Sequence, residues 1–316
     1  MEPEDGPSTE IGPPHLAEPP DLACTLLNSL LSLRQRCGTR PALLALNGPV
    51  GAGKSTLSRQ LIALAESRGL RLAVASIDDF YYPWPERLRR LQGNPFGVSR
   101  VPPGSHDLPL LLERLADWRA GGPLRLARFD KGLAGGEGDR ADDQVLEAEA
   151  LLIEGWLMGC RSLGEERLAA CRGDQLRDWS LTAQEWAWLP RWDRELAAYE
   201  ELWHACDGLW VLRPQRWSLP RRWRFQAEAR QRRSGRGSLE PGALDQLVRA
   251  SLHSLPPPLY QDPLVISQRG AVPREDSASS PSSVVPLLGV TVLDGRRRPL
   301  PGSAQLSLSS ASVAIG

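Results

Sequence analysis

The chain has 316 residues, of which 41% are hydrophobic and 24% are charged, so it can form one large α/β domain or two smaller ones with a buried core. Lys plus Arg and Asp plus Glu each number 38, and a chain without net charge shows no overall preference for nucleic acid or for an anionic membrane. No apolar run approaches the ~18 residues that a membrane-spanning helix needs. We therefore expect neither nucleic acid nor a membrane as partner, and any anion site must be local.

The cysteines and the N-terminus favour a cytoplasmic protein. The five cysteines include no CxxC pair, which fits neither a disulfide framework nor a zinc site and indicates reduced thiols. The first residues are acidic and rich in proline, and they lack the basic and apolar regions of a signal peptide. We expect a cytoplasmic protein, with a monomer as the simplest state.

The predicted elements begin after a Pro-rich, acidic segment at 1–20 that we expect to be disordered. A leucine stripe predicts an N-terminal helix within 21–39. Further strands are predicted at 42–46, 72–77, 124–129, 150–154 and 208–212, and further helices at 56–68, 108–119, 191–204 and 218–232. Strands that alternate with helices imply a mainly parallel sheet flanked by helices on both faces.

The C-terminal part of the chain differs in composition from the rest. No aromatic residue follows Tyr260, and the chain beyond it is rich in Ser, Pro and Gly, with three consecutive arginines at 296–298. We predict one folded domain at 40–265 and a disordered tail at 266–316 that the domain does not require.

The strongest motif is a phosphate-binding loop. Residues 48–55 read G-P-V-G-A-G-K-S, which fits G-x-x-x-x-G-K-[ST] between a predicted strand and a predicted helix. In such a loop the backbone N–H groups turn inward on a phosphate, and the helix N-terminus adds its dipole. The predicted ATP-binding residues are Gly48, Pro49, Val50, Gly51, Ala52, Gly53, Lys54, Ser55 and Thr56. Lys54 would contact the β- and γ-phosphates, and the Ser55 hydroxyl would bind Mg²⁺. The alternative is a chance glycine-rich turn.

This motif predicts a P-loop NTPase fold, a three-layer α/β architecture, and it leaves the class of P-loop protein open. A GTPase would need a DxxG segment and an N-K-x-D guanine reader, and the chain contains neither. The partner motifs of helicases and transporter ATPases are also missing. Small-molecule kinases remain as the large group that fits.

Two neighbouring carboxylates follow the second predicted strand. Asp78 and Asp79 stand in the segment S-I-D-D-F-Y at 76–81. The carboxyl ends of parallel strands line the ligand crevice, where one carboxylate can accept the proton of an attacking hydroxyl and another can help to hold Mg²⁺. The alternative is that the two aspartates only cap the following turn.

The segment S-x-D-x-F-Y after a P-loop resembles the phosphoribulokinase, uridine kinase and pantothenate kinase superfamily. Five further motifs, in one collinear order within about 40–262, resemble the plant, fungal and cyanobacterial type of D-glycerate 3-kinase. They are P-G-S-H-D at 103–107, F-D-K at 129–131, G-D-R-A-D at 138–142, E-G-W-L-M-G at 154–159 and W-R-F-Q-A-E at 223–228. Members of that family usually read Y-D-K-S where this chain has F-D-K-G at 129–132, so any role of that Ser is absent here.

The resemblance implies ATP-dependent phosphorylation of D-glycerate to 3-phosphoglycerate, with ATP and Mg²⁺ as cofactors and a small hydroxy acid as substrate. It implies that Asp78 is the catalytic base. It also implies that four residues bind the hydroxy-acid substrate: His106, Asp107, Lys131 and Arg140. From spacing alone, Asp107 could instead cap the helix that begins at 108, and Arg140 could be a solvated loop residue.

Two more groups complete the predicted site. Glu154 ends an apolar strand like a Walker-B acid and, with Asp79 and Ser55, would hold Mg²⁺ directly or through water; a strand-end acid that faces solvent is the alternative. Arg224 lies in a basic helical stretch that could be a nucleic-acid patch, a self-paired surface or a helical lid over ATP. We favour the lid because the stretch matches the family pattern and the chain has no net charge. Two alternative functions stay open: a uridine or pantothenate kinase-like activity, and a regulatory nucleotide-binding protein that hydrolyses ATP slowly.

Overall fold

The fold is seen in a computed structural model, which describes residues 21–171, 176, 179–235, 239–266, 285–301 and 304–305. The helices are α1 Leu22–Arg36, α2 Lys54–Ser67, α3 Trp84–Arg90, α4 Leu108–Arg119, α5 Glu165–Ala170, α6 Ala183–Ala197, α7 Glu200–Ala205, α8 Leu219–Arg233, α9 Pro241–His253, α10 Pro257–Tyr260 and α11 Asp262–Ile266, with 3-10 turns η1 Ile77–Phe80 and η2 Ala134–Gly136. The strands are β1 Ala42–Asn47, β2 Leu72–Ser76, β3 Leu124–Asp130, β4 Asp139–Leu146, β5 Ala150–Gly155, β6 Gly208–Pro214, β7 Leu287–Leu293 and β8 Ala304–Gln305. Among the described helices, none is both long and apolar enough to cross a bilayer.

The main sheet has the order β2-β5-β1-β6-β7-β8. The first five strands are parallel, and β8 runs antiparallel to β7. The central strand β1 is buried along its whole length between β5 and β6, which explains its unbroken apolar sequence. The predicted fold class, a mainly parallel sheet flanked by helices, is confirmed.

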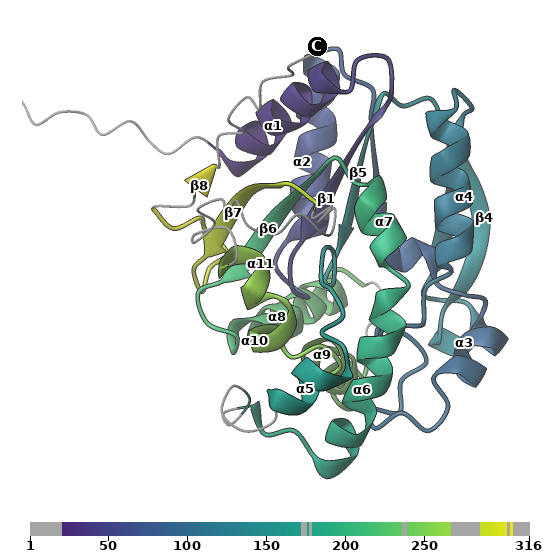
Figure 1. Ribbon diagram of the computed structural model, residues 1–316, viewed down its shortest axis with the longest axis vertical. Coiled ribbons are helices and arrows are strands. Elements are labelled where there is room, and N and C mark those ends of the chain that lie inside the picture. The colour runs from purple at the N-terminus through teal and green to yellow at the C-terminus, as the bar shows by residue number, and fades with distance from the viewer. Residues whose placement is uncertain are drawn as a thin grey trace, which may run out of the picture.

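Helices cover both faces of this sheet (Figure 1). On β1, Leu43 and Ala45 point into a core built with α4, α6 and α7, whereas Leu44 and Leu46 point into a second core built with α1 and α2. Successive side chains of a strand point to opposite faces, so one apolar run supplies both cores. The predicted N-terminal helix is α1, and it belongs to this domain because its leucines fill the second core.

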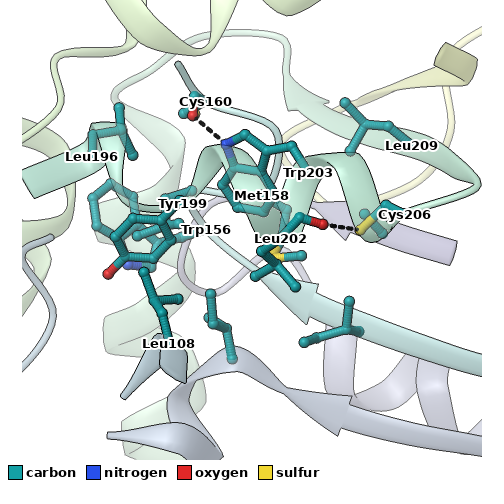
Figure 2. Packing of buried hydrophobic residues seen from close by; sticks show 14 of the residues in the cluster. Leu108, Trp156, Met158, Cys160, Leu196, Tyr199, Leu202, Trp203, Cys206 and Leu209 are labelled. Atoms are coloured by element: carbon teal, nitrogen blue, oxygen red, sulfur yellow. Dashed lines mark hydrogen bonds between the residues drawn. The ribbon is translucent and has the colours of Figure 1, made fainter. Parts of the chain in front are cut away.

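The core beside α7 contains several of the tryptophans (Figure 2). Trp156 and Trp203 are buried there, and the Trp203 Nε1–H donates a hydrogen bond to the carbonyl of Cys160 at 2.8 Å. Tyr199 lies in the same cluster, near Leu196 and Leu202. These tryptophans are part of the core and stabilise it.

Two predicted elements differ in the structure. The strand predicted at 124–129 is β3, but it pairs antiparallel with β4 in a separate two-stranded sheet and does not join the main sheet. The charged segment Asp139–Asp142, expected in a connecting loop, forms the start of β4, because β3 offers it backbone partners. The helix predicted at 191–204 is two helices, α6 and α7, interrupted at 198–199.

The prediction of a disordered, dispensable tail at 266–316 is wrong for the part that the structure describes. β7 extends the parallel sheet beside β6, and Leu287, Leu288, Val290 and Leu293 are buried. The segment L-L-G-V-T-V-L is an apolar run of strand length, and the composition of its neighbourhood masked this signal. Residues 267–284, 302–303 and 306–316 of this tail lie outside the described residues, as does the segment 1–20 that was expected to be disordered.

A chain that ends at residue 266 is therefore expected to be strongly destabilised. Burial of a Leu or Val side chain contributes about 1.5–3 kcal/mol, so loss of the four buried β7 residues removes on the order of 6–12 kcal/mol, comparable with a typical total stability of about 5–15 kcal/mol. Thermal unfolding of purified protein measures this. A chain that ends at residue 305 keeps all described elements and should melt close to the full-length protein. Equal melting of the 266-residue chain would show that β7 is not needed for stability.

Candidate active site

The phosphate-binding loop connects β1 to α2. Gly51 and Gly53 have φ values of +75° and +95°, which residues with a side chain rarely adopt. At Gly51 a Cβ atom would also lie only 2.7 Å from the backbone nitrogen of Arg224. Glycine is required here both by backbone conformation and by the close approach of α8.

The loop opens onto a cavity of about 800 Å³ at the carboxyl ends of the strands. Most of the predicted site residues line it: Val50, Gly51, Ala52, Gly53, Lys54, Ser55, Thr56, Asp78, Asp79, Lys131, Glu154 and Arg224. Gly48 and Pro49, at the start of the loop, do not line the cavity, and their carbonyls accept hydrogen bonds from the Lys54 ammonium at 2.7 and 3.3 Å. The cavity thus brings together the loop and acidic side chains from two different strands.

Glu154 and Lys54 form the charged centre of this cavity. Their Oε2 and Nζ atoms are 3.6 Å apart, and both side chains are largely buried. Burial raises the pKa of the Glu154 carboxyl, and the neighbouring Lys54 ammonium offsets this only in part. The alternative of a solvent-facing strand-end acid is wrong for Glu154.

The residues fit a nucleotide-bound Mg²⁺ better than a free metal ion. Among the residues that the structure describes, no group of three or more His, Cys, Asp or Glu side chains is arranged to hold a metal by itself. Mg²⁺ in kinases needs only one or two protein oxygens besides nucleotide phosphates and water. Ser55, Asp78, Asp79 and Glu154 present such oxygens around one cavity.

Asp78 and Asp79 have different surroundings although they are adjacent. Asp79 Oδ2 accepts a hydrogen bond from the Ser76 N–H at 3.0 Å, so this carboxylate caps η1, which was the alternative reading of the sequence. Asp78 Oδ1 instead accepts a hydrogen bond from the Tyr81 hydroxyl at 2.9 Å. Its side chain is 39% exposed and faces the cavity. Both carboxylates line the cavity, but Asp79 is bound to the backbone of η1, so Asp78 is the better candidate to contact a substrate.

Asp78 is held as a carboxylate. Burial alone would raise the pKa of Asp78, but the His106 ring, then Lys131 and the Tyr81 hydroxyl outweigh burial and lower the pKa to about 2. The Nε2 atom of His106 lies 3.5 Å from Asp78 Oδ1. This carboxylate stays ionised over the whole physiological pH range.

His106 lies behind Asp78 and outside the cavity. The His106 ring is buried, stacks on Tyr81 with 4.6 Å between ring centroids, and shares a 2.6 Å hydrogen bond between Nδ1 and the Tyr199 hydroxyl. Other side chains enclose the His106 ring, and it does not line the cavity, so its predicted contact with the acid stays a prediction. Tyr81 ends the S-I-D-D-F-Y segment but was given no role from the sequence, and Tyr199 was missed because an isolated tyrosine gives no signal of such a role.

Asp107 and Arg140 also lie outside the cavity. Asp107 caps α4 through the Leu110 N–H at 3.2 Å and pairs with Arg140 Nη2 at 2.9 Å. Arg140 donates a second hydrogen bond to the Tyr81 carbonyl at 2.8 Å. The pair fixes the segment that carries Tyr81, and the predicted contacts of these two residues with the acid stay predictions. The alternative reading of Asp107 as a helix cap is confirmed.

Lys131 does lie at the cavity, in the exposed turn that follows β3. Its charge contributes to the low pKa of Asp78. A cation beside Asp78 suits the carboxylate of a hydroxy acid.

Arg224 reaches the cavity from α8, which packs directly on the loop at Gly51. Its Nη1 atom pairs with Glu228 Oε2 at 2.6 Å, so the predicted self-pairing of this helix is also present. Arg230 of the same helix and Arg297 from the turn after β7 line the cavity too. Arg297 was missed because it lies in the predicted tail.

This combination of a parallel sheet, a phosphate loop between β1 and α2 and acids at neighbouring strand ends is the P-loop kinase fold. No protein-family model matches the chain. It is similar to the chloroplastic D-glycerate 3-kinase of Arabidopsis thaliana, with 28% identity over 221 residues, 66% of this chain and 45% of that protein. It is also 28% identical over 200 residues to a Schizosaccharomyces pombe protein described as uncharacterized kinase mug58, covering 60% of this chain and 70% of that protein.

Solved structures agree on the fold. The D-glycerate 3-kinase of Cryptococcus neoformans var. grubii serotype A superposes with a TM-score of 0.75 at 24% identity, over 90% of this chain and 99% of that one. The resemblance to D-glycerate 3-kinases seen in the sequence motifs is thereby confirmed. The chain spans less than half of the length of the Arabidopsis relative.

Proposed function

We propose that the protein is an ATP-dependent kinase that phosphorylates D-glycerate to 3-phosphoglycerate. The observation that carries the proposal is the single cavity in which the phosphate loop, the Lys54–Glu154 pair, Asp78 and Lys131 meet. The similarity to two proteins described as D-glycerate 3-kinases supports glycerate as the acceptor. We also propose a monomeric, cytoplasmic protein; its five free cysteines fit a reducing compartment.

In the proposed reaction, a glycerate hydroxyl attacks the γ-phosphorus, the bond to the bridging oxygen of ADP breaks, and the hydroxyl proton passes to Asp78. Because the pKa of Asp78 is about 2, this carboxylate orients the hydroxyl and takes its proton late, as suits a loose phosphoryl-transfer transition state. Lys54 and the loop N–H groups stabilise charge on the transferring group, and Lys131 pairs with the glycerate carboxylate. Mg²⁺, when bound through Ser55 and acids such as Asp79 and Glu154, would neutralise charge on the β- and γ-phosphates.

A panel of phosphate acceptors tests this proposal. Purified full-length protein is incubated with MgATP and, in separate reactions, with D-glycerate, L-glycerate, uridine, pantothenate or no acceptor, and ADP and the phosphorylated product are measured. We expect D-glycerate to be used about 10²-fold or more better than the other acceptors, and 3-phosphoglycerate to be the product. Preferred phosphorylation of uridine or pantothenate would contradict the assignment of glycerate as the acceptor. Slow formation of ADP in the reaction without acceptor would favour a regulatory ATPase.

His106 is expected to act by positioning Asp78. In His106→Asn the carboxylate loses the neighbour that most favours its charged form, so the pKa of Asp78 rises and the acidic limb of the kcat profile moves to higher pH. Loss of the ring that supports Asp78 and Tyr81 should also lower kcat about 10-fold or more at neutral pH. Profiles of kcat against pH measure both effects.

His253→Asn is the matched control for this experiment. His253 is also largely buried, but its contacts are with Glu185 and Trp179, away from the cavity. Its pH profile should follow that of the unmodified protein. A His106→Asn profile that does so as well would contradict the positioning role.

A further inference from the structure

The turn that follows β7 presents one arginine in a constrained conformation. The Asp294 carboxylate accepts hydrogen bonds from the backbone N–H groups of Arg296 and Arg298 at 2.7 and 2.8 Å. Between them, Arg297 has a φ value of +65°, which is uncommon for a residue other than glycine. Hydrogen bonds within the turn therefore stabilise the backbone conformation that orients the Arg297 side chain.

Helix α8 holds this turn against the phosphate loop. Trp223 Nε1 donates a hydrogen bond to the Gly295 carbonyl at 3.0 Å. The same tryptophan is fully buried and lies directly on Gly51, where a Cβ atom would be 2.8 Å from Trp223 Cβ. The turn, α8 and the loop thus form one packed unit.

Arg297 itself binds the phosphate loop, 246 residues away in sequence. Its Nε donates to the Gly51 carbonyl at 2.7 Å, and its Nη2 donates to the Trp223 carbonyl at 2.9 Å and to Gln226 Oε1 at 3.3 Å. The Arg297 Cδ atom lies 3.8 Å from the position that a Cβ at Gly53 would take. These contacts fix the orientation of a loop carbonyl and so of the N–H groups that follow it.

The Arg297 guanidinium brings a positive charge to the phosphate loop. The acceptors of Arg297 are uncharged, and it makes no ion pair within the described residues. Burial, then the neighbouring Arg230 and Arg222, lower the pKa of Arg297, yet a guanidinium stays protonated. Arg297, Arg224 and Arg230 all line the cavity beside the loop. Arg224 is paired with Glu228, whereas Arg297 has no charged partner among the described residues. Partly buried charges are normally paired, so the Arg297 guanidinium calls for an anionic ligand.

We propose that Arg297 is an additional nucleotide-binding residue, which holds the phosphate loop through the Gly51 carbonyl and adds positive charge beside the polyphosphate of the bound nucleotide. This inference rests on the proposed ATP site and extends that site to the segment after β7.

The test is the ATP affinity of Arg297→Met, a side chain that lacks both the charge and the donors. Calorimetric titration of the full-length protein with MgATP, without acceptor, should show a Kd about 10- to 100-fold higher than that of the unmodified protein. Arg296→Met removes the same charge from the same turn, but its side chain is exposed and lies outside the cavity. Its Kd should stay within about 2-fold.

Arg297→Lys covers the case in which Arg297→Met does not fold. Lysine keeps the charge but cannot donate to the Gly51 and Trp223 carbonyls in the same fixed geometry. The Kd of Arg297→Lys for ATP should therefore lie between that of the unmodified protein and that of Arg297→Met. ATP binding as tight as that of the unmodified protein in a folded Arg297 variant overturns the inference alone. An unmodified protein that binds no ATP overturns the proposed function together with it.

Discussion

Replacement of Asp78 by asparagine is expected to lower kcat by roughly 10²–10⁴-fold. Asparagine keeps the shape of the side chain but cannot accept the hydroxyl proton. Asp78 faces the cavity, and its carboxylate is kept charged by His106 and Lys131, so its loss removes an ionised group from the acceptor side of the site. ATP affinity should change little, because the loop contacts remain. Steady-state kcat and an ATP titration measure the two effects separately.

Asp79→Asn is the matched control, since it removes the neighbouring carboxylate. Asp79 caps η1 through the Ser76 N–H, so its replacement should affect stability and Mg²⁺ dependence more than chemistry. Added Mg²⁺ should restore part of its activity. If Asp79→Asn instead loses kcat independently of Mg²⁺ while Asp78→Asn remains active, the two roles are assigned the wrong way round.

Lys54→Ala is expected to lower kcat by about 10²–10³-fold or more, because a preorganised cation beside the transferring group is lost. The structure adds a second consequence. Glu154 loses the partner that lies 3.6 Å away, so the pKa of its carboxyl, already raised by burial, should rise further. A protonated Glu154 is a poorer Mg²⁺ ligand, and Mg²⁺ affinity should therefore fall as well.

Lys131→Ala is the control for Lys54→Ala, because it removes a second lysine from the same cavity. We expect it to raise KM for the hydroxy acid and to leave ATP affinity unchanged. The measurements are kcat, KM for each substrate and the melting temperature of each variant. Full activity in a folded Lys54→Ala protein would overturn the phosphate-loop assignment.

The sequence by itself determined the elements whose signals are local. The loop at 48–55 needs glycines at fixed positions, and Gly51 and Gly53 do adopt positive φ. Fully apolar runs identified β1 and β5, because a central parallel strand is buried on both faces. The same local reading gave α/β layering, and it placed Asp78 and Glu154 at strand ends, where the structure brings both to one cavity.

The tertiary structure decided which side chains reach that cavity. His106 and Arg140 stand in motifs like those of Lys131, but they turn inward to support Asp78 and Tyr81, and local sequence does not encode whether a polar side chain faces a ligand or a neighbour. β7 was missed because its stability comes from pairing with β6, far away in the chain, and not from the composition around it. Arg297 reaches Gly51 only because β7 pairs with β6, the neighbour of β1, and so brings the turn after β7 to the phosphate loop. Long-range pairing and packing set these contacts, since their free energy exists only once distant segments are in place.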